Sequence, residues 1–334
     1  MLNPEKHPFY GHSEAEFFVA KRNGEVVGRI AALENKPFNR YHAAKDAEFY
    51  LFDCINDQEV ANLLFETVFD WARKRGLNKM VGPKGFGPLD GYGIQIEGFE
   101  HRQMMNMMNY NYPYYRDLVE TIGFTKVVDF VSSYVNPQQF QLPPKVRKAA
   151  DIAKKRGTFE VLNFKNKREL KSWAGKIGQA YNQAFVNNWE YYPLTQREID
   201  FVVNNVMTIV DPDLIKIIVK DGNVVGFVFP FPDVSAAMQK NKGKLGPIEI
   251  IRLLMEIKRT NWIAFNGVGI LPEYHGLGGN AVMYAELEKS MHQNVQFINA
   301  ELTQVAETAK QMRNDLKNLG VKFYKNHRVY QREI

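Results

Sequence analysis

Short apolar runs alternate with segments of helical periodicity along the whole chain. Apolar residues that recur every three or four positions predict amphipathic helices, and short apolar runs between turn residues predict strands. The elements predicted in the second half are strand 159–164, helices 168–185 and 195–210, a hairpin, an insertion at 235–261, a strand ending at Pro272, a helix from about Asn280, strand 295–302, helix 308–319, and strands to the end. This order predicts an α/β (α+β) fold with a mixed sheet.

The first half carries a similar pattern. It predicts a hairpin, a strand at 48–53, a helix at 57–75, a strand at 79–81 and a helix that ends at Gly123. Each half has a two-residue turn of a type common in hairpins, Asn-Gly at 23–24 and Asp-Gly at 221–222. The offset between these turns nearly equals that between Gly123 and Gly320, which both end predicted helices, so the unit is predicted to be duplicated.

The most distinctive chemistry lies at 268–283, where an apolar strand runs through a glycine-dense turn into a helix. The first turn of a helix leaves N–H groups without internal partners and carries partial positive charge, so it binds anions. Glycines at 276, 278 and 279 permit close approach because they have no Cβ. The turn lacks the Gly-Lys-Ser/Thr ending of a P-loop and the third glycine of a dinucleotide fingerprint. It is a candidate phosphate site of another kind, or an ordinary glycine-rich turn.

The loop at 275–280 resembles motif A of the GNAT N-acyltransferases, in which an apolar-x-Pro step leads into Arg/Gln-x-x-Gly-x-Gly/Ala. His275 stands where Arg or Gln is usual, and Asn280 stands where Gly or Ala is usual. The Asn280 side chain would either crowd the ligand or cap the helix. The resemblance implies that acetyl-CoA or another acyl-CoA binds at Val268, Ile270, His275, Gly276, Leu277, Gly278, Gly279 and Asn280, through strand groups for pantetheine and loop amides for pyrophosphate.

Most of the chain also resembles a group of uncharacterised bacterial tandem GNAT-like proteins, at Gly82-Pro83, Gly98-Phe99, 111–115 with Gly123-Phe124, Asn188-Trp189 and 193–195. The resemblance implies two tandem GNAT-like acyl-CoA N-acyltransferase domains. The expected ranges are a degenerate GNAT-like domain at 1–136, a basic helical linker at 137–157 and a C-terminal GNAT domain with the acyl-CoA motif at 158–334.

The matching strand-to-helix junction of the first half, at 52–57, has no glycine. It carries Asp53 and Asp57, whose carboxylates suit the helix dipole themselves and would repel a pyrophosphate. We therefore expect only the second half to bind coenzyme A. The first half would be a scaffold or would contribute contacts to the acceptor.

Acyl transfer to an amine requires a base for the ammonium proton, donors for the oxyanion and an acid for the departing thiolate. The usual acid of the family is a tyrosine, and Leu316 stands at that place. Tyr324 and Tyr284 are candidate substitutes, or they are core aromatics. Glu301, on the strand after the motif helix, is a candidate base, or it forms a salt bridge at a strand end.

The expected function is acyl-CoA-dependent N-acyl transfer by the C-terminal half, with an acetyl group as donor and a small-molecule or peptide amine as acceptor. An active N-acyltransferase is the leading hypothesis, and because the tyrosine is missing, the alternative is a catalytically degenerate acyl-CoA-binding or scaffold protein. A third alternative is aminoacyl transfer from tRNA through the basic segment at 145–156.

Composition narrows the partners and the location. The chain has 45% hydrophobic and 24% charged residues, as soluble globular proteins do, and no apolar stretch approaches the roughly 20 residues that cross a bilayer. It begins without an apolar signal core, and its single cysteine, Cys54, fits a reducing compartment, so a cytoplasmic location is expected. Oligomeric state is not predicted.

The net charge of +6 is partly concentrated at 145–156, where no aromatics are interleaved. We expect this segment to form a solvated helix face, and we do not expect nucleic acid as a partner. The histidines are scattered singly, so no metal site is expected. The insertion at 235–261 contains an amphipathic helix after Pro247, which faces a core, covers the cleft or binds a partner.

Overall fold

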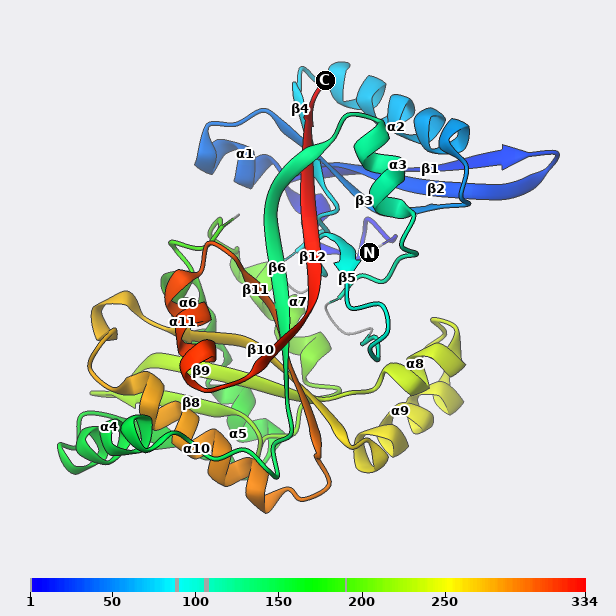
Figure 1. Ribbon diagram of the computed structural model, residues 1–334. Coiled ribbons are helices and arrows are strands. Elements are labelled where there is room, and N and C mark those ends of the chain that lie inside the picture. The colour runs from blue at the N-terminus through cyan, green and yellow to red at the C-terminus, as the bar shows by residue number, and fades with distance from the viewer. Residues whose placement is uncertain (1, 88–89, 105–107, 190) are drawn as a thin grey trace. The chain divides into compact units, whose positions relative to one another are not determined.

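The chain forms two compact units, and the computed structural model describes residues 2–87, 90–104, 108–189 and 191–334 (Figure 1). The first unit comprises Met1–Ser132, Gln304–Thr308 and Tyr324–Ile334, and the second comprises Ser133–Thr303 and Ala309–Phe323. Each is a mixed sheet with flanking helices, so the predicted fold class is confirmed. The units depart from the expected ranges, since residues 133–136 belong to the second unit and Gln304–Thr308 belong to the first. The C-terminal residues Tyr324–Ile334 belong to the first unit, and the segment 137–157 belongs to the second.

The first unit has the strand order β1-β2-β3-β4-β12-β6, with β5 also beside β12. Its elements are η1 (Pro8–Gly11), β1 (Glu14–Arg22), β2 (Glu25–Glu34), α1 (Lys36–His42), β3 (Asp46–Cys54), α2 (Gln58–Arg73), β4 (Lys79–Gly82), β5 (Ile94–Glu97), α3 (Tyr115–Thr121), β6 (Thr125–Val135) and β12 (Lys322–Glu333).

The second unit has the strand order β11-β10-β9-β8-β7. Its elements are α4 (Pro144–Lys155), β7 (Glu160–Leu162), α5 (Lys167–Ser172), α6 (Ala174–Ala184), α7 (Gln196–Val206), β8 (Lys216–Lys220), β9 (Asn223–Pro232), α8 (Ser235–Asn241), α9 (Pro247–Arg259), β10 (Trp262–Ile270), η2 (Pro272–Tyr274), α10 (Gly279–Gln293), β11 (Asn299–Ala306) and α11 (Lys310–Asn318).

Local backbone requirements explain the elements that recur in both halves. At the two predicted hairpins, Asn23 and Gly24 have φ of 52° and 87°, and Asp221 and Gly222 have 50° and 76°. Positive φ at both central residues is the geometry of a type I′ turn, which matches the twist of the flanking strands. Both hairpin predictions are confirmed.

The two helix ends predicted from matching glycines also have the same geometry. Gly123 and Gly320 follow α3 and α11 with φ of 99° and 72°. The amide after each glycine donates to the carbonyl of Val119 or of Leu316, at 3.2 and 3.3 Å. This bond satisfies a carbonyl that the helix leaves free, and only glycine adopts the required backbone without strain.

Two expectations for the second unit are wrong. The helix predicted at 168–185 is interrupted at Trp173, which ends α5 and begins α6, and Gly175 lowers helix propensity beside the break. The basic segment at 137–157 is not a linker, because α4 packs on α10. Arg147 Nη2 lies 2.6 Å from Glu288 Oε2, and Lys154 forms an ion pair with Glu286.

Apolar residues cover both faces of the second unit's sheet. On β8, Ile218 packs in one cluster with residues of α10, whereas its neighbours Ile217 and Val219 pack in another with residues of α6. Successive side chains of a strand point to opposite faces. We call these the α10 face and the α6 face of the sheet, and they separate the candidate site residues below.

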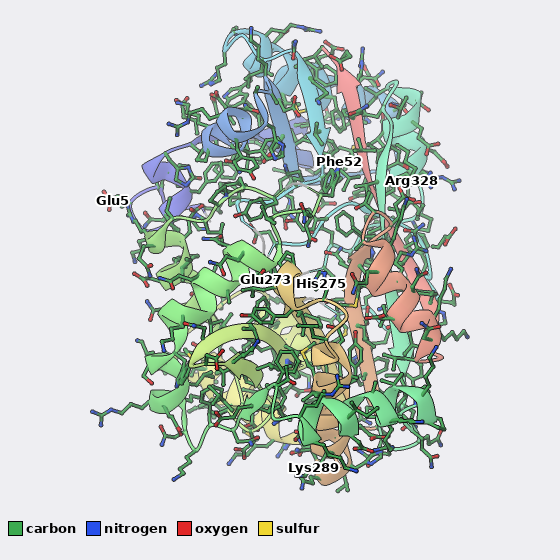
Figure 2. The ribbon with its side chains drawn as sticks, turned by 90° about the vertical axis from the view of Figure 1, so that its left-hand side faces the viewer. Glu5, Phe52, Glu273, His275, Lys289 and Arg328 are labelled. Carbon is green, nitrogen blue, oxygen red and sulfur yellow. The ribbon has the colours of Figure 1, made fainter. Side chains whose placement is uncertain are left out.

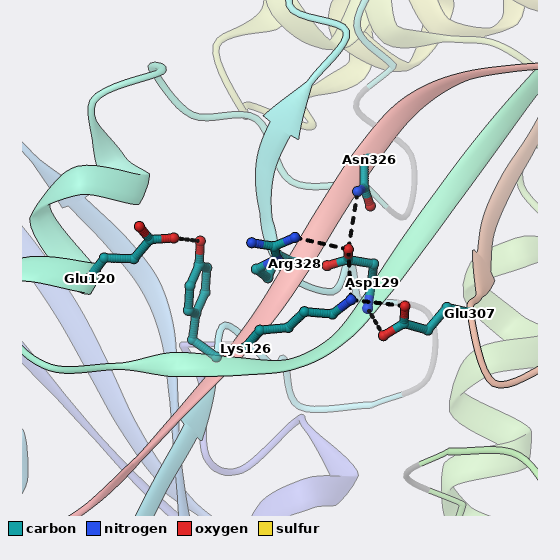
Figure 3. Close-up of polar contacts among 7 residues, drawn as sticks. Glu120, Lys126, Asp129, Glu307, Asn326 and Arg328 are labelled. Atoms are coloured by element: carbon teal, nitrogen blue, oxygen red, sulfur yellow. Dashed lines mark hydrogen bonds and ion pairs between the residues drawn. The ribbon is translucent and has the colours of Figure 1, made fainter.

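A polar cluster joins the late segments of the chain to the first unit (Figure 3). Asp129 on β6 accepts from Arg328 Nε and Nη2 on β12 at 2.8 and 3.0 Å, and from Asn326 Nδ2 at 3.3 Å. Lys126 bridges Asp129 and Glu307, with N···O distances of 3.0 and 2.9 Å. Burial would raise the pKa of Asp129, but the hydrogen bonds from Arg328, Lys126 and Asn326 lower it overall.

His327 is a titratable group inside the first unit. It is fully buried on β12, and its Nε2 lies 3.1 Å from the carbonyl of Asn109. Burial lowers the pKa of His327 to about 4, and Lys325 adds to the effect. The native state therefore holds a neutral imidazole at a pH where the unfolded chain takes up a proton.

Replacing His327 with Gln should flatten the pH dependence of stability. The ordinary pKa is 6.5, so as pH falls from 6.5 to 4 protonation favours the unfolded state and stability is lost. Over that window the wild type should lose up to about 3 kcal/mol more free energy of unfolding than His327→Gln, which keeps an N–H donor for the Asn109 carbonyl. Denaturant titrations at several pH values measure the difference.

His42→Gln is the control, because His42 is exposed. It should preserve the wild-type slope. Equal slopes for all three proteins would contradict the assignment of the acid sensitivity to His327.

Candidate active site

The candidate site begins where β10 separates from β11. The two strands pair in parallel from Trp262 opposite Asn299 to Phe265 opposite Leu302, and the pairing ends there. On its other side, β10 has an irregularity, since Gly267 and Val268 together oppose a single residue of β9. Gly267 has φ of 58°, which is the geometry of a bulge that begins with a left-handed glycine. The bulge turns the end of β10 and leaves polar backbone groups facing the gap.

The glycine turn follows directly, between β10 and α10 (Figure 2). Gly276 and Gly278 have φ of 75° and 89°, and α10 begins at Gly279 without a side-chain cap. Within the described part of the chain, the amides from Gly278 to Ala281 have no hydrogen-bond acceptor. These amides and the helix dipole give the turn the capacity to bind an anion.

Packing distinguishes the two left-handed glycines. A Cβ at Gly276 would meet nothing within 4 Å, whereas one at Gly278 would lie 3.0 Å from Cβ of Ala153 on α4. Gly278 therefore serves the contact between α4 and the turn, and Gly276 borders open space. Leu277 between them is 50% exposed.

His275 and Asn280 have side-chain partners within the unit. Nε2 of His275 lies 2.8 Å from the carbonyl of Ile270, the last residue of β10, and donates to it in the tautomer that carries the proton there. The Asn280 amide donates to Asp315 Oδ2 at 2.9 Å, so its side chain does not cap α10. Both side chains hold the turn to its neighbours, which leaves the loop amides as its binding groups.

Tyr284 shares the carboxylate that Asn280 uses. Its hydroxyl donates to Asp315 Oδ2 at 3.3 Å. Burial and the charge of Asp315 raise the pKa of Tyr284. The phenol proton is thus held on the α10 face by a neighbouring carboxylate, which makes Tyr284 a weak acid.

Glu301 lies on the opposite face of the sheet from Tyr284. Its neighbours on β11, Ala300 and Leu302, pack in the cluster with α10, so Glu301 points toward the α6 face. Glu301 is fully buried and stands opposite Ala264 on β10. The structure therefore does not bring these two candidate catalytic residues together.

Two further polar residues lie on the same face of the sheet as Glu301, and neither is predicted as a site residue from the sequence. Asn266, 6% exposed, directly precedes the bulge, and Thr303 stands one pleat beyond Glu301. The Thr303 hydroxyl lies within hydrogen-bonding distance of Asn266 Oδ1 and 3.3 Å from the Phe265 carbonyl. Nδ2 of Asn266 has no acceptor among the described residues. In the sequence, the signal that could have identified this pair is an asparagine directly before a glycine inside a predicted strand, at positions 266 and 267.

Tyr324, the third catalytic candidate, belongs to the first unit. Its ring packs against His101, with centroids 4.8 Å apart, and Lys325 Nζ lies 4.7 Å from its centroid. Its role in catalysis stays a prediction, and its environment is that of a packed aromatic.

In the first unit, the junction between β3 and α2 corresponds to the glycine turn, and the carboxylate of Asp57 occupies it. At the start of α2, Asp57 accepts from the amides of Glu59 and Val60 at 2.9 and 3.3 Å. The hydrogen bond from Arg22, with help from these amides, lowers the pKa of Asp57. A carboxylate thus occupies the helix start, where an external anion would otherwise bind.

An apolar slot opens on the α10 face of the second unit, beside the gap between β10 and β11. Its cavity volume is about 80 Å³, and the slot is partly open to solvent. The lining residues are Val135, Pro137, Phe140, Phe265, Val268, Tyr284, Leu287, Glu288, Met291, Ala300, Leu302, Met312, Leu316, Leu319 and Val321. The carboxylate of Glu288, the one charged group among them, is paired with Arg147. The slot follows α10 from Tyr284 to Met291, a distance of about 10 Å at the helical rise.

The described residues do not meet the requirements of a metal site or of a membrane-spanning helix. Among them no group of His, Cys, Asp and Glu side chains is placed to hold a metal ion. None of the helices in the described ranges combines the length and the apolar character needed to cross a bilayer.

The chain has the fold of tandem GNAT proteins, as its similarity to a solved structure shows. No family model matches the chain. A tandem GNAT protein from the clavulanic acid biosynthesis pathway is similar in structure, with a TM-score of 0.53, 11% identity and coverage of 96% of this chain and 83% of that one. The resemblance to the GNAT superfamily is confirmed for the fold.

Two relatives are similar in sequence over nearly the whole chain. Protein YghO of Escherichia coli K12 is 25% identical over 334 residues, covering 98% of this chain and 85% of the relative. A bacterial ceramide synthase of Caulobacter vibrioides is 25% identical over 339 residues, covering 100% of this chain and 87% of the relative.

Proposed function

We propose that the second unit is an acyl-CoA-dependent N-acyltransferase whose donor carries a long apolar acyl chain. The observation that carries the proposal is the apolar slot beside the gap between β10 and β11, close to a turn with unpaired amides. Pyrophosphate would bind at the turn, pantetheine would pair with the backbone of Val268, and the acyl chain would lie in the slot. An acetyl group, the donor expected from the sequence, would leave the slot empty.

The acceptor would be an amine that approaches from the α6 face. Its nitrogen attacks the thioester carbonyl carbon, a C–N bond forms, the C–S bond breaks, and the thiolate leaves as a thiol after protonation. Glu301 is the proposed base for the ammonium proton, and the Asn266 amide is the proposed donor to the oxyanion. One relative is named a ceramide synthase, and a ceramide is a fatty amide of a long-chain amine, which supports this donor class.

Coenzyme A binding should depend on Gly276. Gly276→Ala places a methyl group at the turn, and we expect the Kd for coenzyme A to rise at least about tenfold, or about 1.4 kcal/mol, by isothermal titration. Gly222→Ala is a matched control, because Gly222 has φ of 76° against 75° and an equally open Cβ position. Both variants carry the same backbone strain, but Gly222 lies in the β8–β9 hairpin. Equal loss in the two variants would count against the turn as the binding site.

The slot should set the preferred chain length. The affinity of the wild type should rise from acetyl- to octanoyl-CoA, since each buried methylene contributes about 0.8 kcal/mol, and should level off at palmitoyl-CoA, whose extended chain is longer than the slot. Ala300→Leu narrows the slot and should weaken palmitoyl-CoA at least about tenfold while leaving coenzyme A itself unchanged. Met291→Ala lengthens it and should shift the preference toward longer chains. Equal affinity for all three thioesters would contradict a long-chain donor.

Glu301 should be required for turnover but not for binding. With palmitoyl-CoA and a panel of primary amines that includes long-chain amino alcohols, Glu301→Gln should lower thiol release at least about 100-fold and leave the Kd for coenzyme A within twofold. Tyr284→Phe, which removes only a hydroxyl bonded to Asp315, should retain most activity. Binding of acyl-CoA without thiol release from any amine would instead favour a catalytically degenerate acyl-CoA-binding protein.

A further inference from the structure

The helical insertion between β9 and β10 exposes an apolar surface. It consists of α8 and α9, which leave the sheet of the second unit together (Figure 1). The exposed apolar residues are Leu245 (71%), Ile248 (63%), Ile250 (41%), Ile251 (56%), Leu254 (49%) and Met255 (42%). We call these six residues the α9 surface. So many large apolar side chains within one short segment exceed what scattered exposure on a soluble protein accounts for.

Only part of the apolar side of α9 is used in packing. Leu253 and Ile257 pack against α8, in a cluster with Val234, Ala237 and Met238. At 100° per residue, the buried residues and those members of the α9 surface that lie in α9 together cover about 220° of the helix, and Leu245 precedes it. Arg252 and Glu256 lie on the remaining arc, whereas Lys258, in the last turn, lies within the apolar arc. A helix that only covered a core would need roughly half of this apolar width.

The charges around the α9 surface are mainly positive. Exposed basic residues stand before α9 and in its last turn, namely Lys240, Lys242, Lys244, Lys258 and Arg259, with Arg252 on its polar arc. The acidic residues of α9 are Glu249 and Glu256. No ion pair of the described residues engages these basic groups. The apolar surface is thus flanked by unpaired positive charge at both ends.

We propose that the α9 surface docks the protein on the surface of a membrane that contains anionic lipids. The apolar arc would sink among the lipid chains near the headgroups, while the lysines and arginines contact anionic headgroups. With 13 residues, α9 is too short to cross a bilayer and would lie in its plane. A second copy of the chain would bring the same positive charges together, so charge complementarity favours the anionic surface.

The docking does not depend on the proposed acyl transfer, because it rests on exposure and charge in the insertion alone. The two are compatible in geometry. The chain passes from the end of α9 at Arg259 into β10 at Trp262, the strand that borders the gap.

Vesicle flotation with the full chain tests the proposal. Wild type should float with vesicles of phosphatidylcholine and phosphatidylglycerol in equal amounts, and the bound fraction should fall in high salt and with vesicles of phosphatidylcholine alone. Ile248→Ser with Ile251→Ser should lower the partition coefficient for anionic vesicles at least about tenfold. Both residues are exposed, so the fold should be retained, and unchanged coenzyme A binding and circular dichroism check this.

The matched control is Leu63→Ser with Val295→Ser, at residues that are 61% and 71% exposed in other parts of the chain. It should float like the wild type. Three results would overturn the proposal: wild type that stays with the dense fraction, an isoleucine variant that floats as well as wild type, or light scattering that shows a dimer which the isoleucine variant converts to a monomer. The last result would assign the α9 surface to a second copy of the chain.

Discussion

The geometry of the second unit depends on hydrogen bonding between neighbouring strands. β10 must satisfy its backbone groups with β9 on one side and β11 on the other, and it does so with both only as far as Phe265. Beyond that residue the bulge at Gly267 turns the strand, the pairing with β11 ends, and polar backbone groups face a gap. The glycine turn, the apolar slot and the buried Glu301 all lie around this interruption. A strand that continued in register would close the gap and leave no place for an extended ligand.

The first unit has a similar bulge in the strand before a helix, but a side chain of its own occupies the start of that helix. On β3, Leu51 and Phe52 oppose a single residue of β2, and Leu51 has φ of 51°, as at the bulge of β10. Its parallel pairing with β4 also ends early, at Glu48. The helix that follows is capped by Asp57, so the N-terminal amides already have an acceptor. The duplicated frame alone therefore does not specify a ligand site, and the residues at the helix start decide it.

The two faces of the second sheet divide the polar and apolar groups of the site. The α10 face carries the apolar slot and the Tyr284 hydroxyl bonded to Asp315. The α6 face carries Glu301 and the Asn266 amide beside the gap. A buried amide group without an acceptor costs free energy in the unliganded protein, so its retention is consistent with use when a ligand binds. In the proposed reaction, the gap lets a thioester carbonyl meet the polar groups while its chain stays among apolar side chains.

The sequence by itself determined the features that a few consecutive residues control. The Asn-Gly and Asp-Gly hairpins, the helix ends at Gly123 and Gly320, and the glycine turn before α10 follow from local backbone preferences, since positive φ restricts which residue fits. Tertiary structure alone decided which distant groups meet. Strand register put Glu301 on the face away from Tyr284, and chain topology put Tyr324 in the first unit. These outcomes depend on pairing between segments far apart in the chain, which local periodicity does not encode.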